Sequence, residues 1–187
     1  VLHHKKRFFN KARNEGAILA TRWSSVSRVD IANKSNPTKK AELRAIWIDG
    51  GTNHSGMIKI TTPIDQMEPM TKSSVGLAYS LKRGTNPNDI IIGSSGGHEV
   101  LYALTQGAGH VDAVELDPSI VKFVNDPEFA SYMGNLYQNP RVTLRNDEGR
   151  AFLRRQPLES YDVIQFVNNY TPVAIGSGAL NLTESYL

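Results

Sequence analysis

The chain has 187 residues, of which 40% are hydrophobic and 21% are charged, and this is the composition of an ordinary globular protein with a sizeable core. It contains no cysteine, which excludes disulfides, thiolate metal sites and thiolate nucleophiles and fits a cytoplasmic location. No apolar run approaches the roughly 20 residues of a membrane helix, and no stretch resembles a signal peptide.

The formal net charge of +3 is distributed unevenly. Residues 1–45 hold 11 Lys and Arg against 3 Asp and Glu, whereas the rest of the chain holds 10 against 15. We interpret residues 1–16 as a basic tail or linker, with an anionic membrane surface or a nucleic acid as the alternative partner. No aromatic and basic platform accompanies this segment, so we expect no nucleic-acid partner.

Residues 17–62 predict a small antiparallel β unit. Residues 17–32 alternate and carry β-branched side chains, which is typical of one or two strands. The Asn, Ser and Pro residues of 33–40 predict a turn. A second strand, ending in a glycine turn, is predicted at 43–51, and a third is expected at 57–62.

Residues 63–187 predict a Rossmann-like nucleoside-binding domain, because alternating strands and helices of this length form a parallel, doubly wound sheet. Asp117 and Pro118 supply a good N-cap and first position for one of the helices. The predicted elements are a helix at 73–84, strand 89–93, helix 97–109, strand 111–116, helix 118–125, an irregular stretch at 126–140, strand 141–146, helix 149–156 and strand 161–167.

The stretch 90-IIIGSSGGHEVLYAL-104 joins the first of these strands to its helix through a Gly/Ser loop. Ligands of parallel sheets bind at this turn. A phosphate-cradling P-loop needs Lys-Ser/Thr after its last glycine, but here His98 and Glu99 follow. The dinucleotide fingerprint needs glycines at positions that are occupied by Ser95 and His98, so it fits poorly.

An adenosyl-sulfonium ligand fits this loop better. Its G-x-G-x-G pattern is met except that Ser95 replaces the second glycine. Glu115, at the end of the next strand, is placed to accept hydrogen bonds from both ribose hydroxyls, as an acid also does in NAD sites. Asp147, after the third strand, is placed to accept from the adenine amino group. The candidate cofactor-binding residues are Gly93, Ser95, Gly96, Gly97, Glu115 and Asp147.

Each of these acids also has a structural interpretation. Glu115 is alternatively a solvated strand end, and Asp117 is best explained as a helix cap. Asp147 and Glu148 are alternatively caps of the helix at 149–156. Asp162 lies at the start of its strand, at the wrong end of the sheet for a ligand. We expect no metal.

Five stretches together resemble the spermidine synthase branch of the class I adenosylmethionine-dependent transferases. They are 47-WIDGG-51, 90-IIIGSSGGHEVLYALTQGAGHVDAVELDPSIV-121, 141-RVTLRNDEGRAFL-153, 161-YDVI-164 and 178-GALNLTESYL-187. The resemblance implies a class I methyltransferase fold, a cofactor that is adenosylmethionine or its decarboxylated form, and a small-molecule acceptor such as a polyamine. It is closest to the subgroup fused to membrane-spanning segments, and this implies a cytoplasmic domain whose basic start lies beside the membrane.

Two acids that this family uses for aminopropyl transfer are replaced. Gly96 stands where an Asp holds the amine of the decarboxylated cofactor. The segment after the fourth strand has no carboxylate to take a proton from an attacking amine, and it offers Asn168, Asn169 and Tyr170 instead. Three functions therefore stay open, namely aminopropyl transfer, methyl transfer to an unidentified small acceptor, and non-catalytic binding or sensing of an adenosyl ligand.

The resemblance also implies further strands beyond the fourth, and the sequence stops at Leu187. We therefore expect a truncated domain without the C-terminal strands, in which strand 161–167 is an edge. Its unpaired backbone groups need a cover. The expected covers are residues 168–187, a second copy of the chain in a homodimer, or a continuation of the chain.

Overall fold

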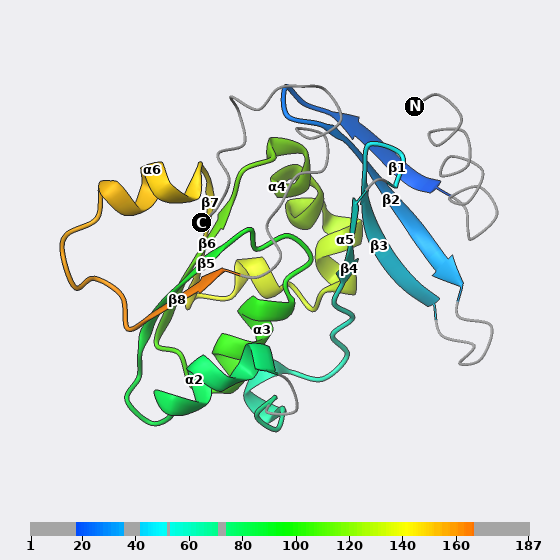
Figure 1. Ribbon diagram of the computed structural model, residues 1–187. Coiled ribbons are helices and arrows are strands. Elements are labelled where there is room, and N and C mark those ends of the chain that lie inside the picture. Colours follow the sequence, from blue (N-terminus) through cyan, green and yellow to red (C-terminus); the bar gives the residue numbers. More distant parts are fainter. Residues whose placement is uncertain (1–17, 36–41, 52, 71–73, 167–187) are drawn as a thin grey trace. The chain divides into compact units, whose positions relative to one another are not determined.

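The computed structural model describes residues 18–35, 42–51, 53–70 and 74–166 (Figure 1). The chain divides into two compact units, and the division falls between Gly56 and Met57. Within the described ranges, no helix combines the length and the apolar character that a membrane crossing needs.

The first unit is an antiparallel sheet with the strand order β1-β2-β3-β4. Ala32, Ala45 and Trp47 form a buried apolar cluster on it. The strands predicted within 17–32 and 43–51 are confirmed, but the first of these segments continues as a strand to Ser35, inside the turn that we predicted at 33–40. The strands of this sheet are β1 (Ile18–Trp23), β2 (Arg28–Ser35), β3 (Glu42–Ile48) and β4 (Asn53–Met57).

The strand predicted at 57–62 is wrong, because β4 lies several residues earlier. Asp49, Gly50 and Gly51 all have positive φ, so the chain reverses within this turn and resumes pairing at Asn53. From Ile58 onward the chain has left this sheet, and the Ile58 N–H donates to the Gly96 carbonyl in the second unit at 3.0 Å.

The second unit is built on a parallel sheet with the strand order β7-β6-β5-β8. β5, which is the first strand of this sheet along the chain, therefore lies between β6 and β8. The order of the strands reverses direction beside it. This confirms the predicted α/β class, with a Rossmann-like parallel sheet and a separate small antiparallel sheet. The strands are β5 (Asn88–Ile92), β6 (His110–Glu115), β7 (Val142–Asn146) and β8 (Val163–Phe166).

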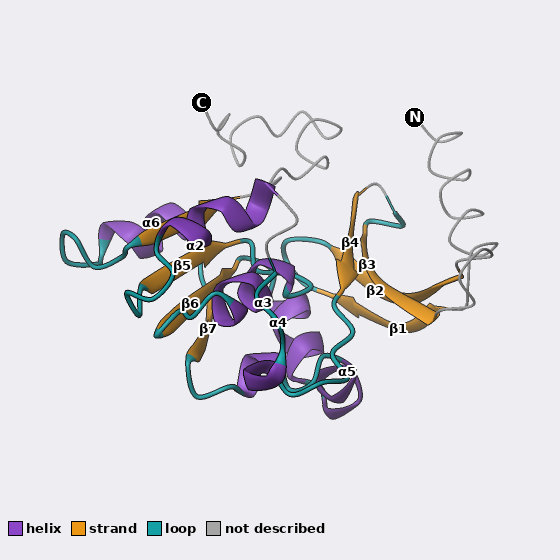
Figure 2. Ribbon diagram, turned by 90° about the horizontal axis from the view of Figure 1, so that it is seen from below, coloured by secondary structure: helices purple, strands orange, loops and turns teal. Residues whose placement is uncertain are grey.

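Helices lie on both faces of the parallel sheet (Figure 2). On one face, Phe152 of α6 packs against Ile90 and Val114. Gly149 permits this close approach, because a Cβ there would stand 2.4 Å from Ile92 Cγ2. The other face carries α3 and α4. The helices are α2 (Leu77–Leu81), α3 (His98–Thr105), α4 (Pro118–Asn125), α5 (Pro127–Tyr132) and α6 (Gly149–Arg154).

Two predicted segments differ in detail from the structure. The helix expected at 73–84 is a 3₁₀ turn followed by the short α2. The stretch 126–140, expected to be irregular, contains α5 and the 3₁₀ helix η3 (Leu136–Gln138). Asp126 and Pro127 start α5 just as Asp117 and Pro118 start α4, with the Asp126 carboxylate accepting the Glu128 N–H at 3.2 Å.

β8 is the outermost strand of the described sheet. Val163 and Gln165 are buried, whereas Ile164 is 58% exposed and Phe166 is 42% exposed. Residues 168–187, one of the three covers that we expected for this edge, lie outside the described residues. The same applies to the acceptor-facing candidates Asn168, Asn169 and Tyr170, and to the basic tail at 1–16.

Candidate functional site

A glycine loop, residues 93–97, follows β5 directly. Its alternate residues Gly93, Ser95 and Gly97 have φ values of +78°, +37° and +85°. These are the three G positions of the G-x-G-x-G pattern, and the serine adopts a backbone conformation that favours glycine. The Gly93 N–H donates to the Val114 carbonyl at 2.8 Å, so the loop begins beside the end of β6.

Glu115, the last residue of β6, lies against this loop. Its carboxylate accepts the Ser95 N–H at Oε2 and the Asp117 N–H at Oε1, both at 3.0 Å. The side chain is buried, and this burial raises the pKa of Glu115 to about 7, although the backbone N–H donors of Asp117, Ser95 and Leu116 oppose the rise. The structure thus excludes the solvated strand end as an explanation of Glu115. A carboxylate has about four acceptor positions, so the group can accept further hydrogen bonds, as ribose hydroxyls require.

Asp117 serves as the N-cap of α4, as we expected. Its buried carboxylate accepts the Ser119 N–H at 2.8 Å. The Asp117 N–H also donates a hydrogen bond to the Glu115 carboxylate, so the cap residue and the acid fix each other's position. The turn that ends β6 and starts α4 is therefore fixed by two side-chain hydrogen bonds.

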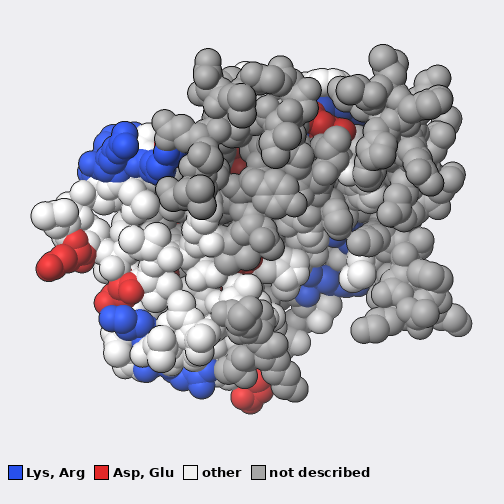
Figure 3. All heavy atoms as spheres, in the orientation of Figure 1, with Lys and Arg blue, Asp and Glu red and all other residues white. Residues whose placement is uncertain are grey.

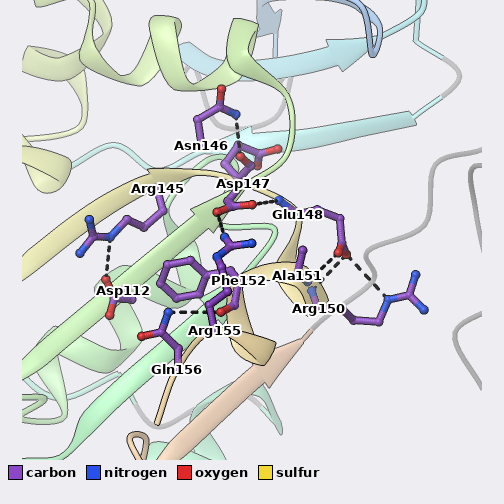
Figure 4. Close-up of polar contacts among 11 residues, drawn as sticks. Asp112, Arg145, Asn146, Asp147, Glu148, Arg150, Ala151, Phe152, Arg155 and Gln156 are labelled. Carbon is purple, nitrogen blue, oxygen red and sulfur yellow. Dashed lines mark hydrogen bonds and ion pairs between the residues drawn. The ribbon is translucent and has the colours of Figure 1, made fainter.

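Asp147 and Glu148 have different roles (Figure 4). Glu148 caps α6, because its carboxylate accepts the N–H groups of Arg150 at 3.1 Å and Ala151 at 2.8 Å. Those donors hold the pKa of Glu148 below its usual value in spite of partial burial. Asp147 does not cap the helix. Its carboxylate accepts the Glu148 N–H at 2.8 Å and pairs with Arg155.

The backbone of Asp147 nevertheless reaches the candidate ribose acid. Its N–H donates to the Glu115 carbonyl at 3.1 Å, and the Asn146 amide donates to the same carbonyl at 2.9 Å. The ends of β6 and β7 are thus tied together. The structure brings Asp147, Glu115 and the glycine loop to one edge of the sheet, as the sequence predicted.

The residues behind the glycine loop were not predicted from the sequence. The buried Tyr137 of η3 places its hydroxyl 2.9 Å from the Ser94 carbonyl and 3.0 Å from the Ser95 carbonyl. A Cβ on Gly97 would stand 2.6 Å from Leu136 Cδ2. The Asp126-Pro127 pair would have located the start of α5, which precedes η3, but no local pattern predicts the contacts of Tyr137.

Asp162 and two arginines at α6 have structural partners in the second unit. Asp162 lies at the amino end of its strand, where it accepts the Asn88 N–H at 3.0 Å and pairs with Lys82 at 3.6 Å. Exposed arginines gather over α6 (Figure 3), and two of them pair with Asp147 and Glu148. Within the described ranges, no group of three or more His, Asp or Glu side chains is arranged to hold a metal ion.

The fold is similar to those of two spermidine synthase crystal structures. One, in complex with the transition state analogue AdoDATO, has a TM-score of 0.55, and the other, from Thermotoga maritima, has a TM-score of 0.54. Each is 18% identical to this chain and covers 79% of it, while the chain spans 46% of each synthase chain. No family model matches the chain, and no curated protein is similar to it in sequence. The likeness establishes the architecture, and the chain has a spermidine synthase-like fold.

Proposed function

We propose that this chain is a spermidine synthase-like transferase domain that binds adenosylmethionine or its decarboxylated form. The observation that carries the proposal is the hydrogen bond from the Ser95 N–H to the buried carboxylate of Glu115. It joins a glycine loop to an acid at the carboxyl edge of a parallel sheet, which is where nucleosides bind in such folds.

The charges around the loop favour a cationic sulfonium ligand over a dinucleotide. Glu99 lies in the first turn of α3, close to the loop. A pyrophosphate bound at that helix start would meet this like charge, whereas a sulfonium centre would be attracted to it. Glu115 would accept from the ribose, and the Asp147 carboxylate, which pairs with Arg155 through one oxygen, would accept from the adenine amino group with its remaining lone pairs.

The choice between donors depends on Gly96. This residue presents no carboxylate to the amine of decarboxylated adenosylmethionine, so an aminopropyl donor loses an ion pair there. Methyl transfer depends mainly on in-line positioning of the acceptor and loses less. We therefore favour transfer to a small acceptor, with methyl transfer retained beside aminopropyl transfer to a polyamine. Asn168, Asn169 and Tyr170 are proposed to face that acceptor.

A second candidate is a non-catalytic domain that binds or senses an adenosyl ligand. It is favoured by the sequence 166-FVNNYTPVAIG-176, which contains no carboxylate to serve as a general base. In either case, we propose a cytoplasmic domain, dimeric or tethered to membrane segments outside this chain, and the basic residues before position 17 support the tether.

The test is a calorimetric titration of the chain with adenosylmethionine, its decarboxylated form, methylthioadenosine and NAD. The proposal expects the adenosyl ligands to bind and NAD to bind at least tenfold more weakly. Turnover is then assayed by mass spectrometry with amine, hydroxyl and thiol acceptors. Binding with no product would support the sensor function, whereas preferential binding of NAD would contradict both functions.

A further inference from the structure

The hydroxyl of Tyr137 lies behind the glycine loop, where water does not compete for its hydrogen bonds. The residue is 5% exposed, and its hydroxyl is within hydrogen-bond distance of the Ser94 and Ser95 carbonyls. A tyrosine hydroxyl carries one proton, so the two carbonyls share it. Burial raises the pKa of Tyr137, so the hydroxyl is protonated and can donate at neutral pH.

The peptide group between Ser94 and Ser95 connects this hydroxyl to the candidate ribose acid. In a trans peptide the C=O and the N–H point in opposite directions. The Ser94 carbonyl points to Tyr137, and the Ser95 N–H of the same plane points to Glu115 Oε2 at 3.0 Å. One rigid peptide plane is thus held at both ends, by a donor on one side and by an acceptor on the other.

These hydrogen bonds stabilise a loop whose backbone is strained. Ser95 has a φ of +37°, which a side-chain-bearing residue rarely adopts. If the Ser94–Ser95 peptide rotated, it would relieve the serine and at the same time turn the Ser95 N–H away from Glu115. A second hydrogen bond, from the Gly97 N–H to the Ser94 carbonyl at 2.9 Å, also resists this rotation. Both of its partners belong to the loop, whereas Tyr137 holds the peptide from η3.

We propose that Tyr137 is a positioning residue for Glu115 and acts on it through the Ser94–Ser95 peptide. Glu115 itself is too deeply buried to be oriented by solvent, and its carboxylate is oriented by the N–H groups of Ser95 and Asp117. Of these, only the Ser95 N–H depends on η3. The positioning of Glu115 is a property of the free protein, whereas its consequence for ligand affinity rests on the proposed function.

The test compares Tyr137→Phe with Tyr161→Phe. Both variants lose one hydroxyl, and that of Tyr161 donates to Asp112 at 2.9 Å, away from the loop. The first measurement is the titration of the Glu115 carboxyl by carbon-13 NMR in the ligand-free protein. Because loss of the Ser95 donor disfavours the ionised acid, the pKa of Glu115 should rise by roughly one unit in Tyr137→Phe. It should not change in Tyr161→Phe. The acids Asp117 and Glu99 near this site are the same in both variants.

The second measurement is the affinity for adenosylmethionine, which should fall about tenfold in Tyr137→Phe and stay unchanged in Tyr161→Phe. An unchanged Glu115 titration in a folded Tyr137→Phe protein would overturn the positioning role. Failure of the wild-type protein to bind any adenosyl ligand would instead remove the proposed function and leave the titration result standing.

If Tyr137→Phe does not fold, proton NMR of the wild-type protein decides. The proposal expects a slowly exchanging Tyr137 hydroxyl proton with nuclear Overhauser contacts to the amides of the glycine loop. A hydroxyl proton that exchanges with water as fast as that of an exposed tyrosine would contradict the proposal.

Discussion

Gly97 packs closely against the side chain of Leu136. A Cβ on Gly97 would stand 2.6 Å from Leu136 Cδ2, and the φ of Gly97 is +85°. A side chain at this position would therefore be strained in its backbone conformation and would also crowd Leu136. This contact holds the glycine loop onto η3, and it connects the candidate site to a segment about 40 residues further along the chain.

Substitution of Gly97 separates these two effects. Gly107 has a similar φ of +94°, but a Cβ there would meet nothing within 4 Å. Gly107→Ala should therefore cost only the conformational penalty, about 1–2 kcal/mol in free energy of unfolding. Gly97→Ala should cost about 1–3 kcal/mol more, because overpacking is added to it. Equal losses in urea unfolding would show that the contact with Leu136 is readily relieved.

At Ser95, in contrast, substitution should increase the stability of the fold. Because its φ is +37°, Ser95→Gly removes backbone strain and should stabilise the fold by up to about 1 kcal/mol, after the added entropy of the unfolded chain is subtracted. Asn135 has a φ of +54°, but asparagine tolerates this region, so Asn135→Gly should change the stability little. A destabilised Ser95→Gly would mean that the serine side chain makes a contact worth more than the strain.

How far the sequence predicts this site depends on the range of each interaction. The loop after β5, the Glu115 position and the Asp117 cap were predicted, because each is encoded by neighbouring residues. The partner of Asp147 was missed, since Arg155 meets it only once α6 is formed. The hydrogen bond from Tyr137 to Ser94 joins residues that are 43 positions apart, so no local sequence pattern predicts it. β4 was misplaced because the length of the preceding turn, and not the apolar pattern, fixes where pairing resumes.

Asp89 should make the stability depend on pH. It is 1% exposed on β5, neither of its carboxylate oxygens has a hydrogen-bond partner among the described residues, and Tyr79 nearby has an equally unpartnered hydroxyl. Burial, together with the charge of Asp162, raises the pKa of Asp89 from 3.8 to about 7. The folded state thus holds a proton that the unfolded state releases near pH 4.

The sign follows from that difference. Between about pH 4 and pH 7 the folded state binds more protons than the unfolded state, so the free energy of unfolding falls as the pH rises, by up to about 1.4 kcal/mol per pH unit for this group. Asp89→Asn should flatten the slope and gain stability relative to the wild type above pH 7. Asp65→Asn, on an exposed turn, is the control. The same slope in Asp89→Asn as in the wild type would refute the assignment.

Asp147 and Glu148 should separate ligand binding from stability. Asp147→Asn should weaken adenosylmethionine binding about tenfold. Its effect on stability should stay below about 1 kcal/mol, because its ion pair with Arg155 is exposed. Glu148→Ala removes the α6 cap and should cost about 1 kcal/mol with no change in affinity. Calorimetry and thermal unfolding of both variants test the assignment, and a loss of affinity confined to Glu148→Ala would reverse it.

The proposed binding of a ribose by Glu115 can be tested by calorimetric titration of Glu115→Gln beside Glu99→Gln. The glutamine keeps the shape of Glu115 but replaces one acceptor oxygen and removes the charge. Glu115→Gln should bind adenosylmethionine roughly one to two orders of magnitude more weakly than the wild type, as expected for a charge-assisted hydrogen bond of about 1.5–3 kcal/mol. The change in Glu99→Gln should be much smaller. Wild-type affinity in a folded Glu115→Gln protein would contradict the claim.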